Sequence, residues 1–470
     1  MRTAALFIAF LAATAAAGAS STAAPSVRAW TGSYTLHGRS ALGVILEGGG
    51  GVVALGTGHA DTQRVRLVRR GTALRFVVPG RPSPVVFTGT SRGHLIRGTV
   101  RQGRARGAFR LVPGAAPGLF ARGFFVAGRR TLAVVDDPYG PARLVDLDSG
   151  EVHALYREGD AFVVGSGFAT RDPTRGVVRL STGGGSVDGA RATRVAVRQL
   201  EVRFRSGGAT LAGTLTLPPG PGRHAAVAFV HGSGPTSRAY LPDLQALLVH
   251  NGLGVLAYDK RGVGQSGGTY PGESPTPQAI ATLARDAEAA VRFLAAQPEV
   301  DPARVGLAGH SEAGWIIPLA ASEEPAVRDV IVFSGPTVTA DENDAYQSLT
   351  GAGDRPQQLT NAEIDAAVVA RGPGGVDPIP WIRTLSVPGL WLYGGLDELI
   401  PSRLSVARLE PLARERGRDF ELVVFPNANH ALVETSTGLT SEMLRSDRFA
   451  PGLFARVEEW LRAHRLTAGT

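Results

Sequence analysis

The sequence contains no cysteine among its 470 residues. It can therefore form no disulfide, carry no lipidated N-terminal cysteine, and use neither a thiol nucleophile nor a cysteine-ligated zinc ion. Lysine is almost as rare: Lys260 is the only one, so nearly all of the formal charge of +8 comes from arginine. The arginines are scattered through strand-like segments instead of forming one run, which favours a solvated surface over a nucleic-acid partner.

Hydrophobic residues make up 43% of the chain, and this length and composition predict two or three folded domains. Residues 1–24 begin with Arg2, continue with a short apolar run and end in small residues, which is typical of a secretory signal peptide. A membrane anchor is the alternative, but the apolar run is short for a bilayer span. We therefore expect an exported protein, periplasmic or extracellular, without stable membrane insertion.

Two strand-rich regions follow the predicted signal peptide. Residues 25–114 alternate polar and apolar side chains in short segments separated by glycines, which predicts antiparallel strands in a small barrel or sandwich. A second β-rich region covers residues 115–198, beginning with a predicted linker at 113–118. The histidines of both regions lack metal-ligand spacing, and we expect neither a metal nor a cofactor; they are His37, His59, His94 and His153.

The pattern changes at residue 199. A predicted hairpin at 200–217 is followed by near-continuous apolar strands that alternate with amphipathic helices. One helix should begin with Thr276 as its cap and Pro277 in its first turn. Such an alternation predicts a mostly parallel sheet covered by helices on both faces, with ligands bound at the carboxyl ends of the strands. Residues 199–470 are therefore the predicted catalytic domain.

A nucleophile is predicted within residues 304–314. An apolar strand ends at Gly309, Ser311 follows, and a buried helix starts near Trp315, so the serine should occupy the tip of a tight strand-to-helix turn. Small residues at 309, 313 and 314 leave room for the crowded backbone of a nucleophile elbow. The alternative is an ordinary Gly-Ser turn that enters a helix.

A serine hydroxyl needs a neighbouring base and an acid that orients it. If the chain order is serine, acid, histidine, only His430 and His464 qualify beyond the motif itself. His464 lies in a charged terminal helix, whereas His430 lies in a turn-rich loop directly after a predicted strand. Asp397 follows the apolar strand at 390–393 and is the predicted acid, with Glu398 as its competitor.

The tetrahedral intermediate of acyl transfer also needs N–H donors, which form an oxyanion hole. The backbone N–H of Glu312, directly after the nucleophile, is one candidate. The loop after the strand at 225–230 should supply the other, and we expect Ser233 to donate it. His231 of the same loop is more consistent with a bracing residue than with a second base.

Five blocks in this order resemble the signature blocks of bacterial α/β-hydrolases, particularly their secreted esterase and prolyl-oligopeptidase-like branch. The blocks are 231–235 (HGSGP), 258–266 (YDKRGVGQS), 309–312 (GHSE), 395–401 (GLDELIP) and 429–430 (NH). The resemblance implies a triad of Ser311, Asp397 and His430, with Asp259 and Arg261 as structural supports. Ala313 departs from the glycine that is commonest at that position. The front half is similar to the β-domains that precede some of these hydrolases.

An insertion at about 337–383, partly helical at 362–369, occupies the usual place of a lid; a surface excursion is the alternative. The first functional hypothesis is therefore an exported serine hydrolase that acts on small-molecule carboxylic esters. A serine peptidase or aminopeptidase is the main rival within the same chemistry. A hypothesis from another class is a non-catalytic protein whose β-domains bind carbohydrate or a surface, but the intact triad argues against it.

Overall fold

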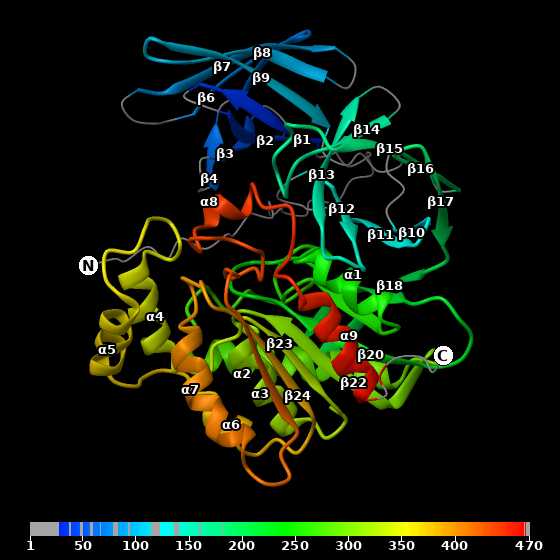
Figure 1. Cartoon of the computed structure of the whole chain (residues 1–470), viewed down its shortest axis with the longest axis vertical. Helices are drawn as coiled ribbons and strands as arrows, with labels where there is room; N and C mark the ends of the chain where they lie inside the picture. Colours follow the sequence, from blue (N-terminus) through cyan, green and yellow to red (C-terminus); the bar gives the residue numbers. More distant parts are fainter. Residues whose placement is uncertain are drawn as a thin grey trace.

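The computed structural model describes residues 28–464 and 466, except for 37–38, 48–49, 57–59, 66, 79–82, 93–94, 114–122, 136–140, 159–160 and 182. The predicted signal peptide lies outside the described residues, as do His37, His59 and His94. Three sheets follow one another along the chain, from the blue N-terminal part to the red C-terminal part (Figure 1). Among the described residues, no helix is long and apolar enough to cross a membrane.

The first sheet has nine strands in the order β4-β3-β2-β1-β9-β8-β7-β6-β5, and each neighbouring pair is antiparallel. Its core contains a stacked aromatic pair, Phe76 and Phe87, with ring centroids 4.6 Å apart. This confirms the all-β region expected from the alternating pattern. The strands are β1 (Arg28–Thr35), β2 (Arg39–Glu47), β3 (Gly50–Gly56), β4 (Ala60–Val65), β5 (Leu67–Arg70), β6 (Ala73–Val78), β7 (Val85–Arg92), β8 (Leu95–Gln102) and β9 (Ala105–Pro113).

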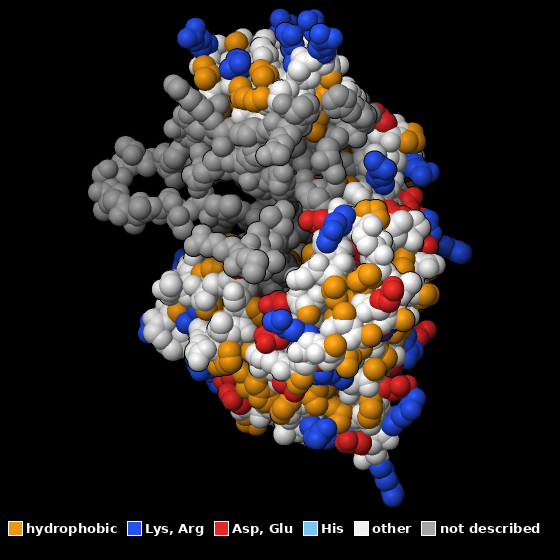
Figure 2. Space-filling model, turned by 90° about the vertical axis from the view of Figure 1, so that its left-hand side faces the viewer, with side chains coloured by type: hydrophobic (Ala, Val, Ile, Leu, Met, Phe, Trp, Pro, Cys, Tyr) orange, Lys and Arg blue, Asp and Glu red, His pale blue; other side chains and the backbone are white. Residues whose placement is uncertain are grey.

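Strand register gathers arginines on the outer face of this sheet. Arg97 lies directly opposite Arg110, and Arg101 lies opposite Arg106. The sequence between Asp61 and Asp136 contains no acidic residue. Figure 2 shows basic side chains concentrated at the end of the molecule that this sheet forms. The arginines look scattered along the sequence, but pairing between strands makes this face strongly basic.

The second sheet is a closed barrel of eight strands, in the order β10 to β17. Alternate side chains of its strands fill the interior, and Phe125 is completely buried there. The strands are β10 (Gly123–Ala127), β11 (Arg130–Val135), β12 (Arg143–Asp146), β13 (Val152–Glu158), β14 (Ala161–Val164), β15 (Gly176–Ser181), β16 (Gly184–Val187) and β17 (Ala190–Val195).

The third sheet has the order β18-β19-β21-β20-β22-β23-β24-β25. The first two strands form the predicted antiparallel hairpin, and the strands from β20 onward are parallel. This order is that of the α/β-hydrolase fold, which confirms the predicted fold class. The strands are β18 (Arg198–Ser206), β19 (Ala209–Leu217), β20 (His224–Val230), β21 (Gly254–Tyr258), β22 (Val300–His310), β23 (Val330–Phe333), β24 (Gly389–Gly394) and β25 (Phe420–Phe425).

Helices cover both faces of this sheet. Alternate residues of β20 enter two different cores, one shared with α2 (Pro277–Ala295) and α3 (Ala313–Glu323), the other with α1 (Pro242–His250) and α9 (Leu453–Ala463). The hydroxyl of Thr276 accepts from the N–H of Ala279 at 3.2 Å, so α2 begins at the predicted cap. The other helices of the domain are α4 (Ala340–Thr350), α5 (Asn361–Arg371), α6 (Ile379–Ile382), α7 (Ser402–Ala413) and α8 (Thr440–Met443).

The barrel packs directly against the hydrolase domain. Arg143 of β12 and Asp243 of α1 form an ion pair in which both side chains are at least nine-tenths buried. The backbone N–H groups of Val152 and Phe168 donate to the carbonyls of Asp447 and Ser446. Residues of both domains also share one hydrophobic core. The barrel is therefore anchored near the segment that follows His430, on the same side of the sheet as α1 and α9.

Candidate active site

Ser311 occupies the turn between β22 and α3. Its φ is +60°, a left-handed conformation that a residue with a side chain adopts only when its surroundings impose it. The backbone N–H of Ser311 donates to the carbonyl of Phe333 at 3.0 Å, which fixes the turn to the end of β23. A Cβ atom on Gly309 would lie 2.7 Å from the Cβ of Ala313. Glycine at 309 therefore makes the room that Ala313, the departure from the commonest elbow, requires.

The predicted acid and base are in contact. Nδ1 of His430 lies 2.8 Å from Oδ2 of Asp397, and the Asp397 side chain is completely buried. The other oxygen, Oδ1, accepts from the backbone N–H groups of Leu399 and Ile400, each at 2.8 Å. An ionised carboxylate held in this way orients the imidazole and stabilises its protonated form.

Glu398, the competitor for the acid role, points elsewhere. Among the described residues no hydrogen bond or ion pair joins it to His430, and its Oε2 is buried without a hydrogen-bond partner. Burial, helped by the neighbouring charge of Asp397, raises the pKa of Glu398 to about 7. The sequence left Asp397 and Glu398 as alternative partners of His430. In the structure His430 pairs with Asp397.

His430 lies beside the nucleophile turn. Its ring centroid is 4.5 Å from that of His310, the residue directly before Ser311. No hydrogen bond joins the Ser311 hydroxyl to His430 within the described part of the chain. Such bonds are often long or poorly aligned without substrate and tighten when it binds. His464 is remote from this arrangement, because it ends α9 and its Nε2 lies 3.1 Å from Asp419.

Two backbone N–H groups adjoin the serine. Glu312 caps the N-terminus of α3, where helix amides favour negative charge. Gly232 packs against Ser311, since a Cβ placed on it would lie 3.2 Å from the Cβ of Ser311. Neither the N–H of Glu312 nor that of Ser233, the residue after Gly232, has a hydrogen-bond acceptor among the described residues. Both predicted oxyanion donors are therefore available to a ligand.

His231 braces the loop that contains Ser233. It is buried, and its Nε2 donates to the backbone carbonyl of Tyr258. Burial, together with the charge of Lys260, lowers the pKa of His231 to about 3. This neutral ring donates its N–H to a backbone carbonyl and so ties the loop to the end of β21.

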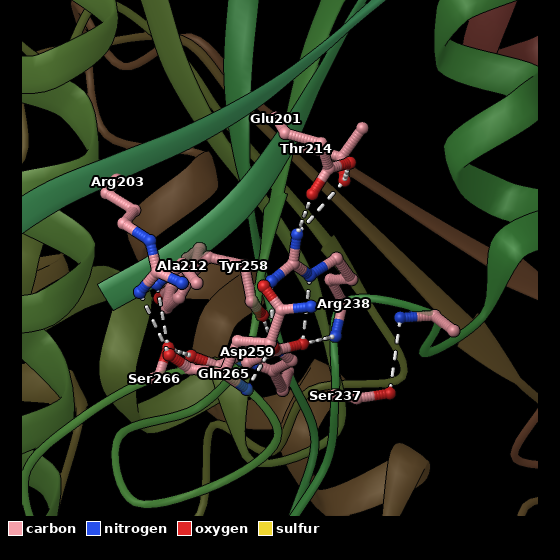
Figure 3. Close-up of polar contacts among 12 residues, drawn as sticks. Glu201, Arg203, Ala212, Thr214, Ser237, Arg238, Tyr258, Asp259, Gln265 and Ser266 are labelled. Atoms are coloured by element: carbon pink, nitrogen blue, oxygen red, sulfur yellow. Dashed lines mark hydrogen bonds and ion pairs between the residues drawn. The ribbon is translucent and has the colours of Figure 1, made fainter. Parts of the chain in front are cut away.

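Asp259, Lys260 and Arg261 follow β21 and each contact a different part of the domain. Asp259 accepts from the Arg238 side chain at 2.9 Å and from the N–H of Gln265 at 2.9 Å (Figure 3). Arg261 forms an ion pair with Asp286 of α2. Asp259 and Arg261 thus each tie this loop to another segment of the domain.

Lys260 was missed by sequence reasoning. Its Nζ donates to the backbone carbonyl of Gly232 at 2.7 Å and contacts the Glu312 carboxylate at 3.0 Å. The signal that could have identified it is its rarity, because it is the only lysine of an arginine-rich chain.

The predicted lid contacts the acid loop. The hydroxyl of Tyr346 on α4 donates to the backbone carbonyl of Asp397 at 2.6 Å. Thr350, at the end of the same helix, donates to the carbonyl of Glu398 at 2.6 Å. The insertion therefore contributes to the position of the acid. No group of three or more potential metal ligands occurs among the described residues.

Comparisons with known proteins show what this chain resembles. Residues 221–361 match the family described as serine aminopeptidase, S33. A Methylorubrum extorquens protein whose name marks it as a provisional carboxymethylenebutenolidase is 28% identical over 151 residues, which are 32% of this chain and 42% of that protein. The match thus spans less than half of that relative's length.

Solved structures with a similar fold include an esterase of Pyrococcus furiosus, with 19% identity, a TM-score of 0.41 and coverage of 57% of this chain and 91% of the esterase. A dienelactone hydrolase of Anabaena variabilis has 20% identity and a TM-score of 0.36, with coverage of 57% and 98%. By its strand order the C-terminal domain has the α/β-hydrolase fold, and the segment that matches the S33 family lies within it. In this chain two all-β units precede that domain.

Proposed function

We propose that the protein is an exported serine hydrolase that cleaves carboxylic esters through an acyl-enzyme intermediate. The observation that carries the proposal is a serine at φ +60° on a strand-to-helix turn, beside a histidine that is paired with a buried aspartate at 2.8 Å. Ser311 is the nucleophile, His430 the base and Asp397 the orienting acid. Export rests on the predicted signal peptide at residues 1–24.

The reaction follows from these positions. Nε2 of His430 takes the proton from the Ser311 hydroxyl as Oγ attacks the ester carbonyl. The carbonyl oxygen becomes an oxyanion, which accepts from the N–H groups of Glu312 and Ser233. The imidazolium then protonates the departing alcohol, and a water molecule, deprotonated by the same ring, releases the acid and regenerates Ser311. Each step returns its proton, so the protein needs no cofactor for this chemistry.

An aminopeptidase is the second candidate, favoured by the description of the matched family. It would need carboxylates that bind the free amine of a peptide. Glu312 is already paired with Lys260. Glu342 is engaged by Arg408 and by the cap of α4, where it accepts from Thr339. Asp341 and Asp344 are exposed on α4. Two of the four carboxylates that could recognise an amine are thus engaged within the protein, which favours esters.

Active-site labelling tests the proposal. A fluorophosphonate should modify Ser311, identified by peptide mapping, and Ser311→Ala should abolish both labelling and ester turnover without lowering the thermal midpoint. Ser334→Ala is a matched control, because Ser334 is also buried, also has a positive φ, and follows the neighbouring strand β23. Labelling that persists in Ser311→Ala, or turnover that disappears equally in both variants, would contradict the assignment.

A further inference from the structure

Lys260 has an unusual environment for a lysine. It is 1% exposed, although lysines are almost never fully buried unless they are paired. Its ammonium contacts the Gly232 carbonyl and the Glu312 carboxylate, and the centroid of the Tyr270 ring lies 5.7 Å away. The Glu312 side chain is also almost inaccessible, with 2% exposure. A buried ion pair contributes little net stability, so its position calls for another explanation.

The contact with Gly232 controls the direction of a peptide group. In a planar trans peptide, the carbonyl of one residue and the N–H of the next point in opposite directions. The carbonyl of Gly232 points toward Nζ of Lys260, at 2.7 Å. The N–H of Ser233 therefore points away from Lys260. Rotation of this peptide group would exchange the positions of the Gly232 carbonyl and the Ser233 N–H. A carbonyl would then lie where the oxyanion hole needs a donor.

The contact with Glu312 affects the second donor. The Glu312 side chain reaches the same ammonium at 3.0 Å, while its backbone N–H is the donor next to the nucleophile. The Lys260 ammonium thus contacts Glu312, whose backbone N–H is one donor. It also contacts the peptide group between Gly232 and Ser233, whose N–H is the other donor. These contacts join segments that are 28 and 52 residues away from Lys260 in the sequence.

The loop that presents Lys260 is itself fixed. Asp259 is held by Arg238, whose N–H also donates to Asp259 at 2.9 Å. Arg261 is held by Asp286 of α2. Because the neighbours on both sides are anchored, the ammonium has a defined position from which to orient its two partners. An arginine at 260 would not substitute well, since its larger planar group spreads its donors over a wider fork.

We propose that Lys260 is a positioning residue that orients both donors of the oxyanion hole, through the Gly232 carbonyl and the Glu312 carboxylate. This inference rests on the proposed function of Ser311. Because donors of this kind act on the developing oxyanion, loss of the ammonium should lower kcat with little change in KM. Loss of one such donor costs about 100- to 1,000-fold in kcat in other enzymes, so we expect a fall of at least about 100-fold.

The composition of the chain permits a clean chemical rescue. Since the sequence has no cysteine, Lys260→Cys introduces a unique thiol. Alkylation of the unfolded variant with 2-bromoethylamine, followed by refolding, gives a lysine analogue with one sulfur in its stem. Alkylation with 1-bromopropane gives a neutral side chain of the same number of atoms. The neutral form is made in a Lys260→Cys/Glu312→Gln background, so that no carboxylate is left buried without a cation.

The aminoethylated protein should recover turnover to within a few-fold of the unmodified enzyme. The propylated double variant should keep its thermal midpoint and KM but lose about 100-fold or more in kcat. An alkylboronic acid forms a tetrahedral adduct on serine, so the double variant should bind it more weakly by a similar factor. Lys260→Met/Glu312→Leu, expressed directly, provides the same comparison if refolding fails, because apolar replacements of buried ion pairs often preserve stability.

Turnover of the propylated double variant, or of Lys260→Met/Glu312→Leu, within about threefold of the unmodified enzyme would overturn the inference. A fall in kcat that parallels the thermal midpoint, with unchanged boronic acid affinity, would also overturn it, because that is the signature of a structural role. Either result leaves the proposed function intact, provided that the unmodified enzyme hydrolyses esters. Failure of the unmodified enzyme to hydrolyse any ester would contradict the proposed function instead.

Discussion

The ring of His310 donates its Nε2–H to the backbone carbonyl of His430 at 2.9 Å. A carbonyl can only accept, so the proton is on Nε2, and Nδ1 accepts from the hydroxyl of Tyr240 at 2.7 Å. Burial and the neighbouring His430 hold the pKa of His310 well below its usual range, so the ring stays neutral. His310, the residue before Ser311, thus fixes the loop that presents His430 through the backbone of that loop.

Loss of the hydrogen bond between His310 and the His430 carbonyl should leave the His430 side chain less precisely positioned. His310→Leu removes this hydrogen bond to the His430 carbonyl, and we expect kcat to fall about 100-fold, as for a misplacement of roughly 1 Å. Tyr240→Phe removes the hydroxyl but leaves the Nε2–H bond, so turnover should fall by less than about tenfold. Steady-state kinetics on one chromogenic ester compares the two. A larger loss in Tyr240→Phe would show that the hydroxyl, not the bond to His430, matters.

The two adjacent carboxyl groups of the acid loop should behave very differently. Asp397→Asn should slow turnover severely, by up to about four orders of magnitude, because the amide favours the wrong imidazole tautomer. Glu398→Gln should reduce turnover only mildly, since Glu398 makes no contact with His430 within the described residues. Comparison of kcat/KM for the two variants measures the difference. The opposite ranking would transfer the acid role to Glu398.

Glu398 should also give the fold a dependence on pH. Its pKa is raised to about 7 in the folded protein, above the ordinary value of 4.5. The folded state therefore retains the proton more strongly than the unfolded state does. This contribution to stability is complete below about pH 4.5 and is lost as the pH rises through 7.

Glu398→Gln does not titrate and isolates this effect. Relative to the variant, the unmodified protein should lose up to about 3 kcal/mol of unfolding free energy between pH 5 and pH 8, because the pKa of Glu398 is about 7 in the folded protein. Urea denaturation of both proteins at the two pH values measures the difference. A constant difference across this range would mean that Glu398 titrates normally in the folded state.

Local patterns in the sequence predicted the strands of the hydrolase domain and its helices α1, α2, α3, α5 and α9, but not α4, α6, α7 or α8. The apolar runs, the Thr276-Pro277 cap and the turn at Ser311 depend on residues that are close in sequence, and the structure has each of them. Contacts between distant segments were not predictable in this way. The ammonium of Lys260 reaches a carbonyl 28 residues away, and His310 reaches one 120 residues away. Backbone carbonyls leave no signature in the sequence.

The architecture of the β-domains could not be predicted from local patterns either. Alternation of polar and apolar residues predicts strands with two different faces, and an open sheet and a closed barrel share this alternation. It therefore did not distinguish the nine-stranded sheet from the barrel of β10 to β17. The pairing of Arg97 with Arg110 likewise depends on register between strands, which is why a basic face looked like scattered charge.

Esters should be turned over much faster than amides of the same acyl group. Both reactions share the attack by Ser311 and the same oxyanion donors, so stabilisation of the oxyanion does not separate them. The leaving group does, because an alcohol departs readily, whereas an amine must first be protonated by His430 at the correct angle. A peptidase usually achieves this by clamping its substrate on both sides of the bond.

The carboxylates that could clamp an amine are partly engaged here, since Glu312 is paired with Lys260 and Glu342 with Arg408. A matched pair of substrates, an aminoacyl ester and the corresponding aminoacyl anilide, decides the matter through the ratio of their kcat/KM values. Asp341→Asn/Asp344→Asn is the companion variant, because it removes the two exposed carboxylates of α4. For an esterase, the ratio strongly favours the ester and is unchanged in this variant. Comparable values for the two substrates, with anilide turnover that collapses in the variant, would identify an aminopeptidase that binds the amine through α4.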